Sequence, residues 1–276
     1  MRTYNTGETE AELRQAYNPD GSALRRAQMR MLDMLVFLEN TCRSLGISFR
    51  LDGGNVLGAV RHGGFIPWDD DVDVVLNRRD YKKLRRHLIA HPHLQYVFHG
   101  QETDPNYFTP WGTLVDLKSE CESSWAENSP QKTVYDRYKY KGIRIDLFCY
   151  EPYAMPRLQR LAAKMTATNM VKVASRSVFC GRIVYKTCMN WVFPLFRCAG
   201  RVFGKRDIYL PSYGTWFYFQ LPKDVLLPHK PIAFEGHTFE GPANADGMLR
   251  LIYGEYMLLP PKEKRAVHTT RITISD

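Results

Sequence analysis

Four aspartates, Asp69, Asp70, Asp71 and Asp73, lie within five positions, and the run leads directly into a β-branched stretch. In an extended chain, residues two apart point to the same face, which places Asp71 and Asp73 side by side, about 6–7 Å apart. Two carboxylates on one face can share divalent cations, and Mg²⁺ typically takes one or two carboxylates together with substrate phosphates. A solvated acidic turn is the alternative, but apolar residues border the run on both sides and disfavour it.

A glycine-containing turn or helix start precedes the acids. Gly58, between Leu57 and Ala59, allows backbone N–H groups to approach a phosphate closely. Eleven residues separate Ala59 from Asp71, and this arrangement resembles the active-site signature of DNA polymerase β-like nucleotidyltransferases. That resemblance implies a third carboxylate on a later, neighbouring strand, for which Asp146 is the candidate. A single acid inside a strand lies more often on an exposed face, so Asp146 gains its weight from the acid pair.

A longer motif gives a more specific resemblance. Residues 52–73, DGGNVLGAVRHGGFIPWDDDVD, resemble the core of the LicD family almost residue for residue. The continuation RRDY at 78–81 does so too, as do FEG at 234–236, YGEYM at 253–257 and PPKEKR at 260–265. The sequence departs from the family pattern at Gly63, Cys149 and Glu151 and over residues 111–119, which concerns substrate identity more than reaction class.

The resemblance implies a nucleotidyltransferase-like fold and a divalent metal, Mg²⁺ or Mn²⁺. It also implies transfer of phosphocholine or a related phospho-alcohol from a CDP-activated donor to a sugar. The acceptor sugar would belong to a cell-surface glycan, such as lipopolysaccharide or teichoic acid, or to its lipid-linked precursor. The related fukutin proteins share this core and use CDP-ribitol, so the donor alcohol can change while the acids stay. We expect Asp71, Asp73 and Asp146 to bind the metal and to be the catalytic residues.

Residues near the acids are candidates for substrate binding: Gly54, Gly58, Arg61, His62, Trp68 and Arg78. Arg61 and His62 are predicted to hold donor phosphate oxygens, for which arginine offers a bidentate grip. His62 could equally be a loop residue whose hydrogen bonds its own backbone satisfies. Trp68 could stack on a base or ring, or be a buried aromatic. Arg78 could pair with the acids or cap the strand.

The elements that would position these residues follow from hydrophobic spacing. We expect helices over residues 22–45, 55–61, 79–89 and 246–253. We expect strands over 47–51, 72–76, 95–99, 114–117, 143–148, 216–220 and 232–239. Their irregular alternation predicts an α+β fold, a mixed sheet flanked by helices of the DNA polymerase β-like nucleotidyltransferase type, with a basic helical insertion. The expected divisions are an N-terminal segment (1–21), a catalytic core (22–150), a basic helical segment (151–210) and a C-terminal part packing on the core (211–276).

The net charge of +9 favours anionic partners. Residues 152–206 contain no Asp or Glu but 11 Lys and Arg, interspersed with apolar residues. This composition predicts helices lying on an anionic membrane surface; helices packed on the sheet with a solvated basic face are the alternative. No signal-peptide pattern, 18-residue apolar stretch or CxxC pair occurs. We therefore expect a cytoplasmic protein with a peripheral contact at the inner face of the membrane.

Two other functions fit the same sequence. A nucleotidyltransferase that moves NMP from an NTP would use the same acids, and a catalytically inactive, glycan-binding relative is a further alternative. Nucleic acid is not an expected partner, because no nucleic-acid-binding motif is present and the acids would repel phosphate without metal. The expected partners are a CDP-alcohol donor similar to CDP-choline and a sugar acceptor on a glycan or glycolipid.

Overall fold

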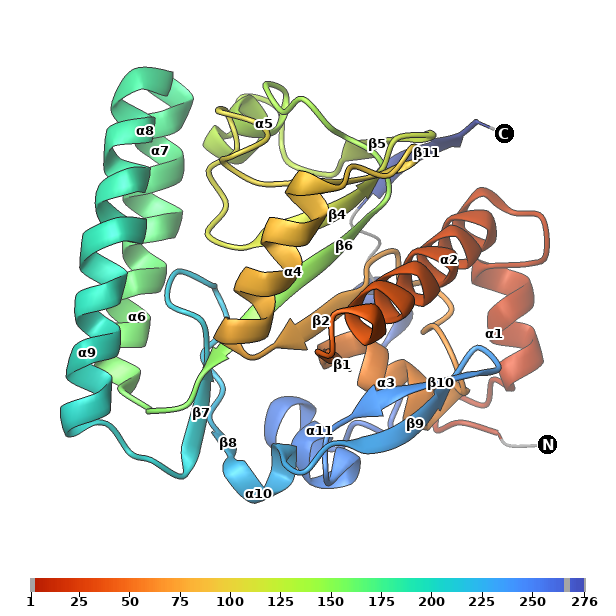
Figure 1. Ribbon diagram of the computed structural model, residues 1–276. Helices are drawn as coiled ribbons and strands as arrows, with labels where there is room; N and C mark the ends of the chain where they lie inside the picture. The colour runs from red at the N-terminus through yellow and green to blue at the C-terminus, as the bar shows by residue number, and fades with distance from the viewer. Residues whose placement is uncertain (1–2, 266–268, 276) are drawn as a thin grey trace.

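The computed structural model describes residues 3–265 and 269–275, and its centre is a mixed, seven-stranded sheet (Figure 1). The main path runs β1 (Arg50–Leu51), β2 (Asp73–Leu76), β6 (Arg144–Glu151), β4 (Gly112–Asp116) and β3 (Tyr96–His99). β2 and β6 are parallel, and the other neighbours on this path are antiparallel. The end of β6 continues the sheet through β7 (Ile208–Pro211) and β8 (Leu221–Pro222).

Two long helices, α2 (Ala23–Ser44) and α4 (Arg78–Ala90), cover one face of the sheet. Each begins at a side-chain cap: Ser22 accepts a hydrogen bond from the N–H of Arg25, and Asn77 from that of Asp80. Leu35 of α2 is fully buried together with the inward residues of β2 and β6. The predictions of helices over residues 22–45 and 79–89 are therefore confirmed within one or two residues.

The opposite face of β2 and β6 carries the acids. Alternate residues of a strand point to opposite faces, so Val75 and Phe148 share the face of Asp73 and Asp146. Val75 and Phe148 pack there against Leu226 of α10 (Lys223–Leu226) and Met248 of α11 (Ala245–Tyr253). Helix α3 (Gly53–His62) connects β1 to the loop that leads into β2, and it ends at Gly63 in a left-handed conformation.

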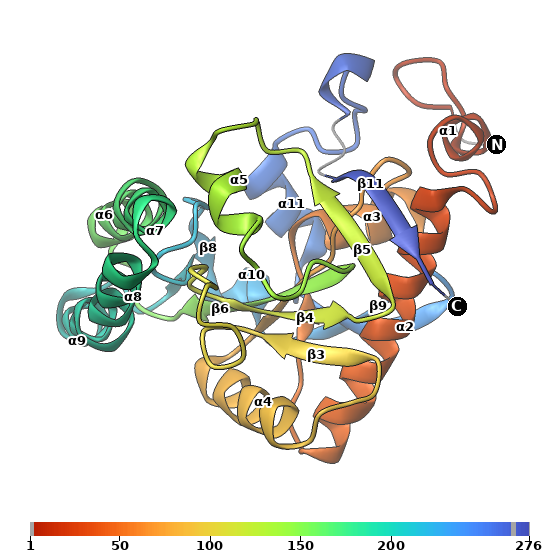
Figure 2. The same ribbon diagram turned by 90° about the horizontal axis from the view of Figure 1, so that it is seen from above.

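The basic segment forms a helical hairpin at one side of the sheet (Figures 1 and 2). One limb contains α6 (Pro156–Lys164), the π-helical turn η1 (Met165–Met170) and α7 (Val171–Arg176). The other contains α8 (Val178–Thr187), the π-helical turn η2 (Cys188–Val192) and α9 (Phe193–Phe203). A separate hydrophobic core holds the limbs together and includes Ala162, Ala174 and Phe193. The prediction of helices in this segment is confirmed, and no helix in the described ranges is long and apolar enough to cross a membrane.

The remaining elements are short. They are α1 (Glu10–Tyr17), β5 (Ser119–Ser123), α5 (Pro130–Tyr135), β9 (Lys230–Phe234), β10 (His237–Gly241), the 3₁₀ turn η3 (Lys262–Lys264) and β11 (Thr269–Ile274). β9 pairs with β10, and β11 with β5, in two-stranded sheets.

Two local predictions differ from the structure. Residues 216–220 form no strand, and Trp216, Phe217 and Tyr218 are partly exposed. The strand predicted over 232–239 is a hairpin, because Glu235 and Gly236 form its turn with φ of 49° and 78°. Helix α1 was not predicted. The mixed sheet flanked by helices is confirmed, whereas its assignment to the nucleotidyltransferase type stays a prediction.

The packing of α3 makes one position sensitive to a single methyl group. A Cβ added to Gly58 would lie 2.3 Å from the carbonyl oxygen of Gly64, and a backbone atom cannot rotate away. We expect Gly58→Ala to lower the free energy of unfolding by about 3 kcal/mol, measured by urea denaturation. The control Gly46→Ala meets no atom within 4 Å but has a φ of 62°, so it should cost only about 1 kcal/mol. Equal losses would contradict the proposed clash.

Candidate active site

The acids line a cavity of about 610 Å³ on the second face of the sheet. Asp73 of β2 and Asp146 of β6 are register partners in the parallel pair, so their side chains lie on neighbouring strands about 4.8 Å apart. Asp69, Asp70 and Asp71 line the same cavity from the loop before β2. The structure therefore brings together the three carboxylates that the sequence selected, although the strand begins at Asp73 and Asp71 precedes it.

The backbone of the acidic loop is fixed by side-chain amides. Asn55 of α3 accepts a hydrogen bond from the N–H of Asp73 at 2.7 Å and donates one to the carbonyl oxygen of Asp71 at 3.4 Å. Gln28 of α2, which is fully buried, donates to the carbonyl oxygens of Ile66 and Asp69. These contacts hold the acids in place without neutralising them. Neither amide was selected as a site residue from the sequence. Asn55 lies within the LicD-like motif but was given no role, and a Gln in a helix carries no distinctive signal.

The tail also braces this loop. Glu235 forms an ion pair with Arg25 at 2.8 Å and accepts a hydrogen bond from the backbone N–H of Phe65 at 3.0 Å. A Cβ at Gly64 would lie 2.2 Å from the Glu235 carboxylate, which explains why glycine stands there. The FEG motif at residues 234–236 thus contacts the loop that leads to the acids.

The carboxylates strongly perturb one another. Burial raises the pKa of Asp73 well above its usual value, and the charges of Asp71 and Asp146 raise it further. Burial and the neighbouring Asp71 likewise raise the pKa of Asp69. Burial also raises the pKa of Asp146 to about 6, although the Arg144 guanidinium works in the opposite direction. The cavity therefore holds more negative charge than its own residues compensate.

The donor set suits a hard divalent cation. Such ions prefer oxygen ligands, and one oxygen of Asp146, Oδ1, is buried with no hydrogen-bond partner. The Arg144 guanidinium and hydrogen bonding from the Trp111 side chain both lower the pKa of this carboxyl. Among the residues that the structure describes, no three such side chains already stand at metal-ligand spacing. The cluster thus offers the chemistry of a cation site without a preassembled coordination shell.

Two basic side chains that line the same cavity were not selected from the sequence. Arg144 lies two residues before Asp146 on β6, so strand alternation places both side chains on one face, and Arg144 lines the cavity. The period-2 pattern around Asp146 could have revealed it. Lys264, in the tail motif, also lines the cavity. Tyr253 approaches from α11, and its hydroxyl would lie 3.6 Å from a Cβ on Gly53.

The two candidate glycines have different surroundings. Gly54, in the first turn of α3, lines the cavity, and a Cβ there would lie 3.0 Å from an Asp69 carboxylate oxygen. Only a residue without a side chain leaves this space open. Gly58 packs against the Gly64 backbone instead, so the structure explains Gly58 by close packing rather than by contact with a ligand.

Arg61 and His62, predicted to hold donor phosphates, do not line the acid cavity. Arg61 donates to the carbonyl oxygen of Tyr256 and to Nε2 of His62, both at 2.8 Å. His62 Nδ1 lies 2.7 Å from a carboxylate oxygen of Glu10, and burial lowers the pKa of His62. The structure places these two side chains where they attach α1 and the tail to α3, and not where the acids meet.

Trp68 and Arg78 also have structural partners. Trp68 lines the acid cavity but is 6% exposed, with the Arg265 guanidinium 4.9 Å above its ring. Arg78 does not line that cavity. It donates hydrogen bonds to Glu151 and Ser212 beside a second cavity of about 430 Å³. Arg78 therefore pairs with Glu151 rather than with the acidic cluster.

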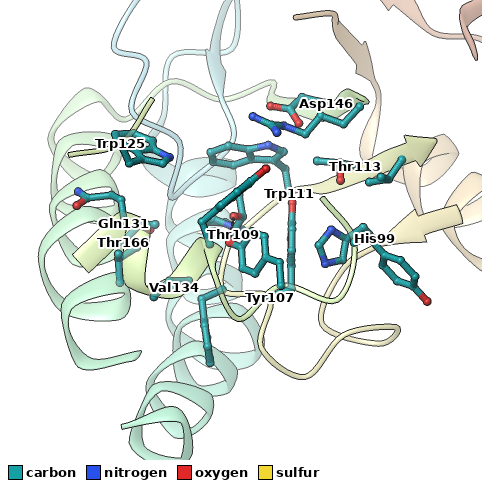
Figure 3. A pocket seen from close by; sticks show the side chains of 18 of the residues that line it. His99, Tyr107, Thr109, Trp111, Thr113, Trp125, Gln131, Val134, Asp146 and Thr166 are labelled. Carbon is teal, nitrogen blue, oxygen red and sulfur yellow. Dashed lines mark hydrogen bonds between the residues drawn. The ribbon is translucent and has the colours of Figure 1, made fainter. Parts of the chain in front are cut away.

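An aromatic pocket of about 160 Å³ adjoins the acid cavity (Figure 3). Trp111 lies close to Asp146 in this view, and Trp111, Trp125, Trp216 and Asp146 line both spaces. Trp216 packs edge-on against Trp111 and Trp125, with ring centroids 5.6 and 6.5 Å apart. These tryptophans come from three separate segments, which is why the sequence did not reveal them as one feature.

Comparison with known proteins shows which chains this one is similar to. The chain is 24% identical to the lipopolysaccharide cholinephosphotransferase LicD of Haemophilus influenzae over 255 residues, which is 89% of this chain and 95% of that protein. The ribitol 5-phosphate transferases FKRP of Mus musculus and Homo sapiens are each 41% identical over 44 residues, 16% of this chain and 9% of theirs.

The family model described as LicD/FKTN/FKRP, nucleotidyltransferase domain, matches residues 46–212. This range is more than half of the chain, and it includes the acidic loop, the third carboxylate and the helical hairpin. The chain belongs to the LicD family.

Proposed function

We propose that this chain transfers phosphocholine from a CDP-choline-like donor to a sugar hydroxyl of a glycan or its lipid-linked precursor, with a divalent cation bound at the acids. The observation that carries the proposal is the pairing of Asp73 with Asp146 beside an aromatic pocket. The similarity to a lipopolysaccharide cholinephosphotransferase over most of both chains supports it. The proposed nucleotidyltransferase-type architecture accords with the paired strands and the third acid.

Asp71, Asp73 and Asp146 are the residues that would hold Mg²⁺ or Mn²⁺. When bound, such a cation neutralises the donor diphosphate and orients its oxygens. The partnerless Oδ1 of Asp146 and the raised pKa of Asp73 support this assignment, because the first is an oxygen that no protein donor reaches and the second marks a buried carboxylate surrounded by other acids.

The other side chains have complementary tasks. Arg144 lies in the cavity beside Asp146, where its guanidinium would bind donor phosphate oxygens in a bidentate manner. One of the carboxylates accepts the proton of the sugar hydroxyl. The hydroxyl oxygen then attacks the phosphorus next to the choline, the bond from that phosphorus to the bridging diphosphate oxygen breaks, and CMP leaves.

The aromatic pocket favours choline as the transferred alcohol. A quaternary ammonium group cannot donate hydrogen bonds, and aromatic faces attract it electrostatically. Trp111, Trp125 and Trp216 supply such faces directly beside Asp146.

The direct test is to incubate the chain with Mg²⁺ or Mn²⁺, an acceptor glycan and a panel of CDP-alcohols, and to measure CMP release. We expect CDP-choline to be the best donor. Pyrophosphate release from an NTP, with no CMP from any CDP-alcohol, would favour the nucleotidyltransferase alternative. A chain that binds glycan but releases neither product would be an inactive relative.

We predict that Asp71→Asn and Asp73→Asn each lower the rate of CMP release at least about a thousandfold. The chain should stay folded, because each substitution removes charge rather than side-chain volume. Asp146→Asn should be severely impaired, and Asp69→Asn more mildly. Circular dichroism and the urea midpoint serve as folding controls. Near-normal turnover of either Asp71→Asn or Asp73→Asn at saturating Mg²⁺ would disprove the metal assignment, and full activity of Asp146→Asn would remove Asp146 from the site.

We predict that Trp216→Leu raises the KM for CDP-choline about tenfold, with a smaller effect on kcat, because one aromatic face beside the ammonium group is lost. Trp216→Phe should retain most of the affinity. Trp191→Leu, which removes a tryptophan from the outer limb of the hairpin, is the matched control with a soluble acceptor. An unchanged KM for Trp216→Leu would argue against the aromatic pocket as the choline site.

The acids also predict how the stability of the metal-free chain depends on pH. Folded Asp146 has a pKa of about 6 against 3.8 ordinarily, so between these values the folded chain binds more protons than the unfolded one. The contribution of Asp146 to stability therefore falls as pH rises from about 4 through 6, and the raised pKa of Asp73 extends the fall in the acids' contribution to higher pH. In thermal unfolding with a chelator present, Asp73→Asn should flatten the dependence of stability on pH. In a separate measurement without chelator, added Mg²⁺ should flatten it in the unmodified chain. The exposed control Asp224→Asn should leave it unchanged, and a pH dependence of Asp73→Asn identical to that of the unmodified chain would contradict the prediction.

A further inference from the structure

The outer limb of the hairpin exposes a row of large apolar side chains. Each of the following is more than half exposed: Phe179 (73%), Ile183 (53%), Trp191 (71%), Leu195 (66%), Val202 (70%) and Phe203 (78%). Single exposed apolar residues are ordinary on a soluble protein, but a row that extends from α8 through α9 is not. Such a row marks a surface that contacts something other than water.

The π-helical turn η2 keeps the row on one side of the limb. Ile183 and Trp191 are eight residues apart. In a regular α-helix this separation would rotate Trp191 about 80° around the helix axis relative to Ile183. The wider π-helical turn over Cys188–Val192 rotates the chain less per residue, so it brings Trp191 back toward the side of the helix that Ile183 occupies. Leu195 and Val202 then follow at intervals of four and seven residues, which is ordinary helical spacing. The irregularity therefore preserves an apolar face.

The core of the hairpin does not need these residues. Ala162, Ala174, Tyr185 and Phe193 already fill the space between the limbs, with Tyr213 contributed from the segment after β7. The solvated basic face considered in the sequence analysis accounts for the lysines and arginines but not for six exposed apolar side chains between them.

The charges around the apolar row indicate what kind of partner covers it. No acid occurs over residues 152–206, and Glu151, which precedes this stretch, is paired with Arg78 and Arg197. Exposed bases flank the apolar row, namely Lys186, Arg201, Lys205 and Arg206. A second copy of this chain would present the same positive charge and be repelled, whereas an anionic bilayer offers phosphates for the bases and acyl chains for the apolar row.

We propose that the outer face of α8 and α9 binds peripherally to an anionic membrane surface. The apolar row enters the boundary between headgroups and acyl chains, and the bases contact anionic headgroups. This binding requires no transfer chemistry. That it brings the acid cavity to a lipid-linked acceptor is a consequence that rests on the proposed function.

The full chain is tested by sedimentation with vesicles of phosphatidylcholine alone or mixed with phosphatidylglycerol, at low and high salt. We expect binding to the anionic vesicles only, weakened by salt. Trp191→Ser with Leu195→Ser should reduce partitioning at least tenfold. Arg201→Glu with Lys205→Glu should reduce it by at least about 25-fold, since each base near an anionic leaflet contributes about fivefold.

Matched controls lie elsewhere on the molecule. Leu94 and Leu251 are 99% and 53% exposed, and Leu94→Ser with Leu251→Ser should bind as the unmodified chain does. On α2, at the opposite side of the sheet in Figure 1, Arg26→Glu with Arg43→Glu matches the charge change and should weaken binding far less than the hairpin variant.

Equal, negligible sedimentation with both vesicle types would overturn the proposal. So would concentration-dependent dimerisation in analytical ultracentrifugation that Trp191→Ser with Leu195→Ser abolishes, because the row would then be covered by a second copy. CMP release with a soluble acceptor separates the two proposals: a chain that binds vesicles but releases no CMP disproves the transferase alone, and the reverse disproves the membrane face alone.

Discussion

The structure depends on holding several carboxylates together inside one cavity. Burial and mutual repulsion raise the pKa values of Asp69, Asp73 and Asp146, so each of these groups destabilises the folded chain whenever it is ionised and uncompensated. The backbone must therefore be fixed by interactions that do not depend on the charge of the acids. The amides of Asn55 and Gln28 and the parallel register of β2 with β6 do this. The result is a fixed backbone that gathers the acids in one cavity without a preassembled coordination shell, at some cost in stability.

The same requirement explains why the family motif is split between residues 52–81 and the tail. Glu235 pairs with Arg25 and holds the Phe65 N–H, Arg61 donates to the Tyr256 carbonyl oxygen, and Arg265 lies over the Trp68 ring. The tail thus packs against α3 and the acidic loop through these contacts. Two basic residues of the core motif, Arg61 and His62, serve this closure, which leaves Arg144 and Lys264 as the cations that line the cavity.

Local patterns predicted what depends on local forces. The hydrophobic periodicity of residues 22–45 and 79–89 was sufficient for the two main helices, and the Asp-x-Asp before a β-branched stretch for β2. Asp146 was selected through the resemblance to nucleotidyltransferases, and the structure places it with Asp71 and Asp73 at one cavity. The sequence could not show which contacts form across the fold. Arg61 looked like a phosphate ligand because its partner, the Tyr256 carbonyl, is 195 residues away. Residues 216–220 looked like a strand because aromatic residues favour strands, yet here Trp216 and Phe217 line the cavity.

Charge is divided between two regions that stay separate in the fold. No residue of the acid-free stretch 152–206 is among the residues that line the acid cavity in the described ranges, so the bases of the hairpin do not neutralise the carboxylates. At the junction, Glu151 is matched by Arg78 and Arg197 and cancels little of the charge beyond it. For the proposed donor, which is anionic, the proposed cation would have to screen these carboxylates before the donor could enter the cavity. An extended anionic surface meets no such barrier at the hairpin, so each region is suited to a different anionic partner.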